Sequence, residues 1–140
     1  MQGHEIFRPF FVMMALTFIV WCAMYVRRIA YFKTHRILPQ KLATPERVAD
    51  IVPEQVQFPA YNLRNLLELP VIFYALCLYL YVTGSVDSLF VSAAWVYVGL
   101  RAIHSAIQCT VNIVMQRFLV HVASSLVLWL MVLRAALGAF

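Results

Sequence analysis

Four long apolar stretches alternate with polar segments along this chain. They predict four helices, over about residues 9–28, 61–82, 88–114 and 118–138. Each stretch is long enough to cross the hydrocarbon layer of a bilayer as a helix. Because the last two connections are only a few residues long, consecutive helices are expected to run antiparallel. The pattern therefore predicts a single all-α membrane domain over residues 1–140, folded as an up-down bundle of four transmembrane helices.

The first apolar run, Phe10–Val26, contains no charged residue and is followed by the basic pair Arg27-Arg28. A cleaved signal peptide is the alternative interpretation of such a run near the N-terminus. A signal peptide carries its basic residues before the apolar run and a small-residue cleavage site after it. Here the basic pair follows the run and no such cleavage site comes after it, which favours a spanning helix.

Composition supports the membrane assignment. Of the 140 residues, 64% are hydrophobic and 12% are charged, whereas soluble domains carry roughly a quarter charged residues. The formal net charge of +5 raises the question of an acidic partner such as nucleic acid. Aromatic residues are not interleaved with the basic ones as in nucleic-acid-binding segments, so we expect no nucleic-acid partner.

The basic residues gather in the first connection, over about residues 29–60, and in the Arg27-Arg28 pair that precedes it. Loops rich in Lys and Arg stay on the cytoplasmic side of a membrane, which places this connection in the cytoplasm and both termini outside. Prolines argue against one long helix through the connection, so short helical turns at the surface are expected. These prolines are Pro39, Pro45, Pro53 and Pro59.

The second apolar stretch begins with polar side chains. Asn65 and Glu68 are three residues apart, which places them on one face of a helix, and Pro70 follows closely. A carboxylate inside an apolar span is unfavourable unless a partner binds it, and such residues usually mark functional sites. We therefore expect Glu68 to be buried beside a binding partner.

The third apolar stretch carries a polar stripe. Its polar side chains recur at helical spacing and so share one face of the predicted helix. They are Tyr97, Arg101, His104, Ser105, Gln108 and Asn112. Such a stripe on a spanning helix must face protein or water rather than lipid.

Glu68, Arg101 and Arg117 are expected at a similar depth, in or beside the inner half of the bilayer, at about 1.5 Å of rise per residue. His121, on the fourth stretch, falls outside this group. A carboxylate that accepts from an ammonium group, and guanidinium groups that hold a carboxylate and a thiolate, suit a small zwitterionic thiol. A tripeptide thiol such as glutathione has these groups, and an apolar co-substrate would arrive through the lipid.

Three features together carry a resemblance to a known family. They are Asn65-x-x-Glu68 with Pro70 after it, then Arg101-x-x-His104-Ser105, then Arg117. In a four-span chain of this size they resemble the membrane-associated proteins in eicosanoid and glutathione metabolism, or MAPEG, over nearly the whole chain. The amino-acid sequence around Asn65, residues 63–71, is most similar to that of the bacterial members. The resemblance implies a homotrimer in the bacterial inner membrane, with three sites between neighbouring subunits that open towards the cytoplasmic leaflet.

The resemblance also implies a membrane-bound glutathione-dependent transferase or peroxidase, in which the thiolate attacks a lipophilic electrophile. Arg117 is then the catalytic residue, because it stabilises the thiolate. Glutathione, as co-substrate, would contact Asn65, Glu68 and Arg101. Basic residues at the inner end of the first helix, Arg27 or Arg28, also contribute in some members. The further substrate-binding candidates are His104, Ser105, Gln108 and Tyr61.

Two positions depart from the family pattern. Tyr61 stands where many glutathione-using members have an arginine, and Gln108 stands where many have a tyrosine. Arg64 is close to Tyr61 in the sequence but is rotated by about 100° from Asn65 around a helix. These departures favour an alternative, a non-catalytic lipid-binding or scaffold protein of the same fold.

Structural readings of the same residues remain open. Asn65 and Glu68 could bond across helices or pair with Arg101, and His104 could be an ordinary interior histidine. A small transporter, with Glu68 and Arg101 on an ion path, is a further alternative, although polar groups thin out towards the outer leaflet. The cysteines fall in apolar runs and read as small buried hydrophobes rather than disulfides or metal ligands. They are Cys22, Cys77 and Cys109.

Overall fold

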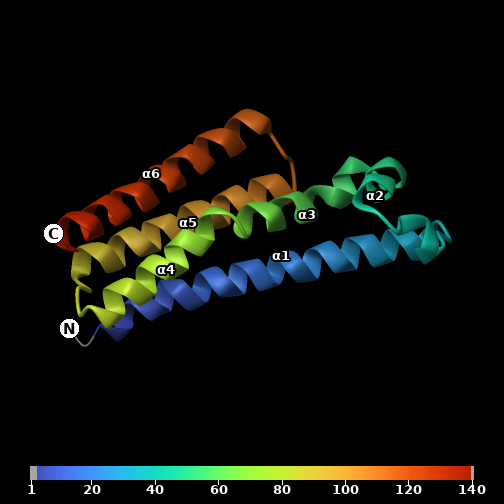
Figure 1. Cartoon of the computed structure of the whole chain (residues 1–140). Helices are drawn as coiled ribbons and strands as arrows, with labels where there is room; N and C mark the ends of the chain where they lie inside the picture. The colour runs from blue at the N-terminus through green and yellow to red at the C-terminus, as the bar shows by residue number, and fades with distance from the viewer. Residues whose placement is uncertain (1–2, 140) are drawn as a thin grey trace.

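The computed structural model describes residues 3–139 of the chain, and those residues form helices without any strand (Figure 1). In chain order the elements are η1 (His4–Ile6), α1 (Phe7–Thr34), η2 (Pro39–Leu42), α2 (Pro45–Ile51), α3 (Glu54–Leu66), α4 (Leu69–Val82), α5 (Ser88–Cys109) and α6 (Val114–Ala139).

Four stretches are long and apolar enough to cross a bilayer: His4–Thr34, Glu54–Val82, Ser88–Cys109 and Val114–Ala139. Helices α1, α5 and α6 each supply one of them, and α3 followed by α4 supplies the other. The predicted all-α architecture with four spanning helices is therefore confirmed. The two chain ends lie at one end of the bundle, as an even number of spans requires, and α2 lies at the opposite end (Figure 1).

The outward faces of the spanning helices are apolar. Phe11, Phe18 and Ile19 on α1 are each 62% exposed, and Leu130 on α6 is 64% exposed. A bilayer covers such surfaces with lipid, whereas water would leave a large apolar patch unprotected. The inner faces form one apolar core, whose fully buried members include Met13, Phe73, Leu80, Ala94 and Leu128.

Two helices extend further than the apolar pattern indicates. Helix α1 continues to Thr34 instead of ending near residue 28, and α3 begins at Glu54 instead of near residue 61. The basic pair Arg27-Arg28 and the mixed composition before Tyr61 mark the limits of the apolar runs, but they do not end the helices. The connection between the spans is correspondingly shorter, and it contains η2 and α2, the short helical turns that its prolines predict.

Pro59 lies inside α3, where it removes the N–H that would bond to the carbonyl of Gln55. The Nη1 atom of Arg27 donates to that carbonyl oxygen at 3.4 Å. Arg27 therefore ties the inner end of α1 to α3 and satisfies a backbone acceptor that the proline leaves free.

Helix α5 ends at Cys109 rather than near residue 114, and α6 begins at Val114 rather than near residue 118. Asn112 in the intervening turn has a φ of 48°, a left-handed conformation that asparagine tolerates better than most residues. Its backbone N–H donates to the carbonyl of Ile107 at 2.7 Å. Asn112, predicted to continue the stripe on the third helix, thus belongs to a turn.

Helices α3 and α4 are separated by a break at Leu67 and Glu68. Pro70, in the first turn of α4, has no N–H for the carbonyl of Leu66, and its ring would clash with that carbonyl in a continuous helix. Glu68 accordingly adopts a ψ of −98°, outside the helical region. The break also changes the surroundings of Asn65, whose carbonyl would bond to residue 69 in an unbroken helix.

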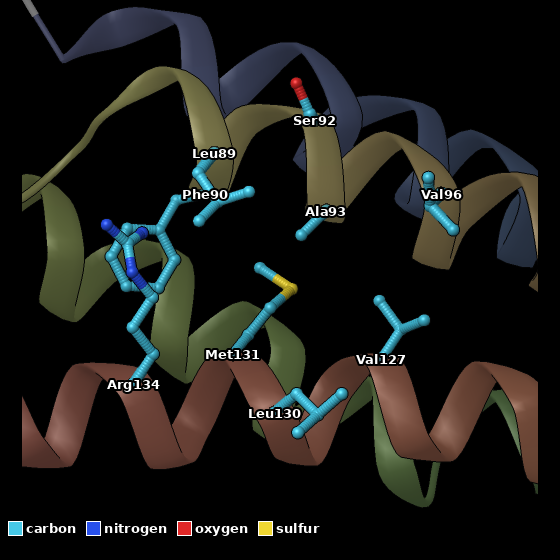
Figure 2. A pocket seen from close by; sticks show the side chains of 9 residues that line it. All are labelled: Leu89, Phe90, Ser92, Ala93, Val96, Val127, Leu130, Met131 and Arg134. Atoms are coloured by element: carbon cyan, nitrogen blue, oxygen red, sulfur yellow. The ribbon is translucent and has the colours of Figure 1, made fainter.

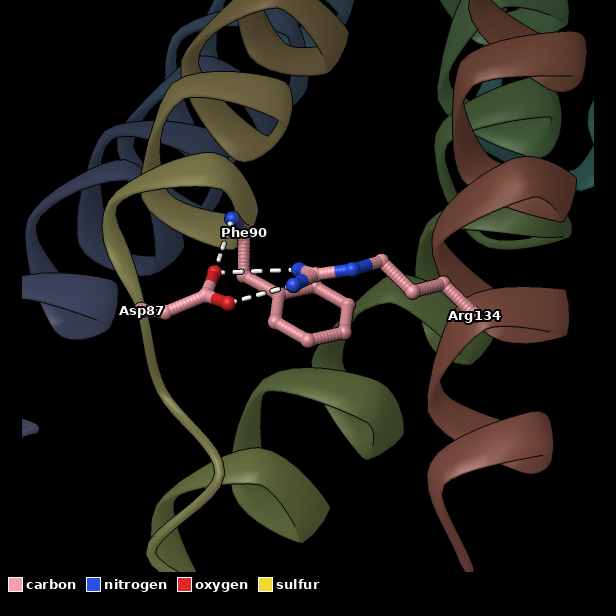
Figure 3. Close-up of polar contacts among 3 residues, drawn as sticks. All are labelled: Asp87, Phe90 and Arg134. Atoms are coloured by element: carbon pink, nitrogen blue, oxygen red, sulfur yellow. Dashed lines mark hydrogen bonds and ion pairs between the residues drawn. The ribbon is translucent and has the colours of Figure 1, made fainter.

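Asp87 and Arg134 join the start of α5 to the end of α6 (Figure 3). The Oδ1 atom of Asp87 caps α5 by accepting from the N–H of Phe90 at 2.9 Å, and it also accepts from Nη1 of Arg134 at 3.0 Å. The guanidinium lies 4.1 Å from the centre of the Phe90 ring. Its hydrogen bond lowers the pKa of Asp87 from 3.8 to about 2. Arg134 therefore has a specific partner at the end of the bundle where the two helices meet.

Candidate functional site

One face of α5 carries the polar interior of the bundle. The stripe predicted from the sequence is buried over most of its length, at Tyr97, Arg101, His104, Ser105 and Gln108. Helix α3 and the N-terminal half of α6 supply the side chains that meet this face. Tyr97 packs against Phe73 of α4, with ring centroids 4.8 Å apart. The polar contacts lie further along α5, towards the end that leads into α6.

Arg101 is the centre of this polar interior. It is fully buried, with a relative exposure of 0%. Its Nη2 atom donates to the backbone carbonyl oxygen of Asn65 at 3.2 Å, and its Nη1 atom lies 3.1 Å from Nδ1 of His121. Because a guanidinium group has only donors, Nδ1 of His121 accepts this bond. Arg101 thus contacts both α3, just before its break from α4, and α6.

No carboxylate neutralises Arg101 within residues 3–139, where the one ion pair is that of Arg134 with Asp87. The pairing of Arg101 with Glu68, left open by the sequence, is not formed. The expected burial of Glu68 also needs correction, because the break between α3 and α4 leaves Glu68 exposed. A buried, uncompensated guanidinium is unfavourable, and it favours the entry of an anion.

Amide and hydroxyl groups connect α3 to α5 beside Arg101. Nδ2 of Asn65 donates to Oε1 of Gln108 at 3.0 Å, and Oγ of Ser105 donates to Oδ1 of Asn62 at 3.3 Å. Ser105, a predicted ligand-binding residue, is therefore engaged between helices. The interhelical bonding left open for Asn65 does exist, but it uses only the side-chain amide and leaves the side-chain carbonyl oxygen without a partner in the described chain.

Arg117 lies in the first turns of α6, where its Nη1 donates to Oδ1 of Asn112 at 2.6 Å. Beside it is a cavity of about 220 Å³. The walls come from α3, α5 and α6 and consist of Asn65, His104, Val114, Arg117, Phe118 and His121. His104 is 2% exposed, and its Nδ1 has no hydrogen-bond partner in residues 3–139. The structure thus brings Asn65, His104 and Arg117 to one cavity, with Arg101 and Gln108 directly behind.

Three of the predicted site residues lie elsewhere in the single chain. Arg27 is bonded to α3 through Gln55. Arg28 and Tyr61 line a second cavity, between α1, α2 and α3, that shares no residue with the first. The predicted set is therefore not brought together in one cavity of the single chain.

His121 is a site residue that the sequence reasoning left out. It lines the cavity and receives a hydrogen bond from Arg101. The available signal was its spacing from Arg117, because residues four apart share a face of a helix. Depth was a second available signal, because Arg101 lies eight residues before the end of α5 and His121 lies seven residues after the start of α6, at a similar distance from the connecting turn.

An apolar groove of about 400 Å³ lies between the first half of α5 and the second half of α6 (Figure 2). Its walls include Ala93 and Val96 from α5 and Val127 and Met131 from α6, with Arg134 at one end. The ten residues between Arg117 and Val127 correspond to about 15 Å along α6. The groove is therefore separate from the polar cavity, and Arg134 is the one charged residue in its lining.

Comparison with known proteins places this architecture in a family. A model of the MAPEG family matches residues 7–137 of the 140-residue chain. No curated protein and no solved structure matches it. The family match includes most of each spanning segment and every residue of the polar cavity. The chain is an integral membrane protein that belongs to the MAPEG family.

Proposed function

We propose that the chain is a membrane-bound glutathione-dependent transferase or peroxidase that acts on a lipophilic electrophile. The observation that carries the proposal is Arg101, a fully buried guanidinium with no carboxylate partner in the described chain. Glutathione supplies two carboxylates, an ammonium group and a thiol, and its thiolate form has a net charge of −2. An anion of this kind would compensate the buried positive charge, which a neutral ligand would not.

The polar cavity divides the proposed work between positioning and activation. Arg101 and the free side-chain carbonyl oxygen of Asn65 would hold the charged ends of glutathione. Arg117, fixed by Asn112, would hold the sulfur and lower the pKa of the thiol from its ordinary value of about 8.5. The thiolate would then attack the electrophilic carbon, forming the carbon–sulfur bond as the leaving group departs.

A single chain provides only part of such a site. The cavity of about 220 Å³ is smaller than typical small-molecule sites of roughly 300–1,000 Å³. Glu68, Tyr61 and Arg64 are exposed and so could face a neighbouring copy. The homotrimer typical of the family would complete the site, with Glu68 accepting from the ammonium group. In this proposal the connection between α1 and α3 lies in the cytoplasm of a bacterial cell, because it carries the basic excess.

Turnover of a chromogenic electrophile by the purified, assembled protein tests the proposal. We expect glutathione conjugation that Arg117→Ala slows by about a hundredfold in kcat, as loss of a positioned activating group does. Arg47→Ala, a matched loss of charge on the exposed surface of α2, should leave the rate unchanged. Intact assemblies without turnover, or equal rates for the wild type and Arg117→Ala, would refute it.

A non-catalytic lipid-binding or scaffold function is the second candidate, and Gln108 favours it. Gln108 stands where many family members have a tyrosine, so this position offers the ligand no phenol. Its amide oxygen also already accepts a hydrogen bond from Asn65. Isothermal titration calorimetry with glutathione separates the two functions. A scaffold would show no binding, whereas the proposed enzyme binds glutathione in a manner that depends on Arg101.

A further inference from the structure

His121 has a neutral side chain whose proton lies on a defined nitrogen. Its Nδ1 atom is 3.1 Å from Nη1 of Arg101, and a guanidinium group can only donate. Nδ1 is therefore the unprotonated nitrogen, because a proton there would set two donors against each other. In a neutral imidazole ring the proton then lies on Nε2. Arg101 thus fixes His121 as a ring that donates through Nε2.

Arg101 can keep this contact while it binds an anion. A guanidinium group carries five N–H donors. One of them reaches His121 and another reaches the backbone carbonyl of Asn65. Nε of Arg101 is buried and has no partner within residues 3–139. The proposed contact between Arg101 and glutathione therefore does not require Arg101 to release His121.

The other polar groups of the cavity are occupied or lack a fixed proton. Arg117 holds the sulfur in the proposed function, and the side-chain amide of Asn65 already donates to Gln108. The ring of His104 has its centroid 5.5 Å from that of His121. No hydrogen bond in the described chain determines which nitrogen of His104 carries its proton. His121 is therefore the cavity donor whose proton position the fold determines.

His121 also lies close to where the sulfur would be held. His121 and Arg117 are four residues apart on α6, and both line the cavity. Residues at this spacing are neighbours on one helix face, with Cβ atoms roughly 5–6 Å apart. A sulfur held by Arg117 would therefore attack a carbon near His121. If that carbon is conjugated with a carbonyl group, negative charge develops on an oxygen only a few bonds further on.

We propose that Nε2–H of His121 stabilises the negative charge that develops on the oxygen of an α,β-unsaturated carbonyl substrate. This role depends on the proposed glutathione-dependent function, for which it names a class of substrate. The thiolate electron pair forms the carbon–sulfur bond at the β-carbon, the C=C pair shifts towards the carbonyl carbon, and the C=O pair moves onto the oxygen. His121 donates to that oxygen. The α-carbon then takes a proton from water, which replaces the proton lost from the thiol.

A neutral imidazole suits this role because its proton is already on the required nitrogen before the charge develops. A donor that needs no rearrangement during the reaction stabilises an oxyanion strongly in a site that excludes water. Neutral histidines polarise carbonyl groups in this manner in other enzymes. Removal of one such donor lowers kcat by about a hundredfold or more.

Two substitutions separate the two nitrogens of His121. The amide oxygen of asparagine lies as many bonds from Cβ as Nδ1 does, so His121→Asn keeps an acceptor for Arg101 and loses the Nε2 donor. The amide nitrogen of glutamine lies as many bonds from Cβ as Nε2 does. His121→Gln therefore keeps a donor at that distance and lacks the Nδ1 acceptor.

Conjugation of two lipophilic electrophiles by the purified, assembled protein tests the proposal. Cinnamaldehyde is an α,β-unsaturated carbonyl compound, whereas benzyl chloride reacts by displacement of chloride and develops no oxyanion. The ratio of the kcat for cinnamaldehyde to that for benzyl chloride cancels any loss common to both, such as a loss of thiolate. We expect His121→Asn to lower this ratio about a hundredfold.

Glutathione affinity, measured by calorimetry, gives the second readout. It should fall less in His121→Asn than in His121→Gln, because asparagine retains the acceptor of Arg101. The ratio of rates should fall less in His121→Gln than in His121→Asn. Ser125→Ala is the control, because its hydroxyl donates only to a backbone carbonyl of α6, and its ratio should equal that of the wild type.

The outcomes distinguish the role of His121 from the function of the site. Equal losses with both electrophiles in His121→Asn, or equal ratios for His121→Asn and His121→Gln, would overturn the role of His121 and leave the proposed function in place. Conjugation of benzyl chloride but not of cinnamaldehyde by the wild type would overturn the substrate class. Wild-type assemblies that conjugate neither electrophile would overturn the proposed function and the role of His121 together.

Discussion

The guanidinium group of Arg101 donates to the backbone carbonyl oxygen of Asn65, 3.2 Å away, at the end of α3. In a continuous helix this carbonyl would accept from residue 69, but Pro70 enforces a break there. A charged side chain on α5 therefore replaces a helical hydrogen bond and fixes the end of α3. The same contact holds the buried charge beside the cavity in which Asn65 and Arg117 meet.

Replacing Arg101 by glutamine should separate stability from binding. Glutamine retains an amide donor for the Asn65 carbonyl and removes a buried charge that has no acidic partner in the described chain. We expect the thermal midpoint in detergent to stay the same or to rise, because the desolvation penalty disappears. Glutathione affinity, measured by calorimetry, should fall by about tenfold or more. A large loss of stability with unchanged affinity would instead indicate a structural role for Arg101.

His121→Leu should weaken glutathione binding although the cavity keeps a side chain of similar size. The substitution removes the acceptor of Arg101, so the guanidinium loses one of its two fixed contacts. We expect an affinity loss of about tenfold, in line with a hydrogen bond to a charged group. Ser125→Ala, one turn further along α6, is the control, because the Ser125 hydroxyl donates only to the backbone carbonyl of His121 within the same helix. Similar effects of both substitutions would argue against a specific role of His121.

Asn112→Gly tests how Arg117 is positioned. Glycine accepts the φ of 48° at this turn but lacks the oxygen that receives the hydrogen bond of Arg117. We expect kcat to fall about tenfold and the pH profile of the rate to move to higher pH, because a less fixed guanidinium stabilises the thiolate less. The thermal midpoint should change little. An unchanged pH profile would show that Asn112 does not position Arg117.

The Asp87–Arg134 pair should contribute to stability in a manner that depends on pH. Its hydrogen bonds lower the pKa of Asp87 from 3.8 to about 2. A lowered carboxyl pKa stabilises the folded state fully above the unfolded value, and this contribution is lost as pH falls towards 2. The thermal midpoint of Asp87→Asn should therefore lie a few degrees below that of the wild type from pH 5 to 8, and the difference should shrink below about pH 4.

Asp87→Ala provides the comparison, because it removes the cap of α5 as well as the ion pair. Asparagine can still accept from the N–H of Phe90, whereas alanine cannot. We expect Asp87→Ala to be less stable than Asp87→Asn by about 1 kcal/mol, with a difference that persists at pH 3. Differences that do not change between pH 7 and pH 3 for Asp87→Asn would contradict the assignment to the ion pair.

Most of the fold follows from local pattern. Runs of apolar residues predict the four spans, and spacing by three and four residues predicts the buried face of α5 with Arg101, His104 and Gln108. The pattern does not reveal where α1 ends or where α3 begins, because a helix can continue past the charged residues that close an apolar span. It also does not indicate that the third helix stops at Cys109, which depends on the turn at Asn112.

The amino-acid sequence by itself determined the membrane class, the number of spans and the polar face of α5, because each depends on residues close together in the chain. Only the tertiary structure decided that Glu68 is exposed, that Arg28 lines a different cavity from Asn65, and that His121 meets Arg101. These relations depend on the break before Pro70 and on how each helix is rotated about its axis. Helix rotation is set by packing against neighbours, so no single segment specifies it.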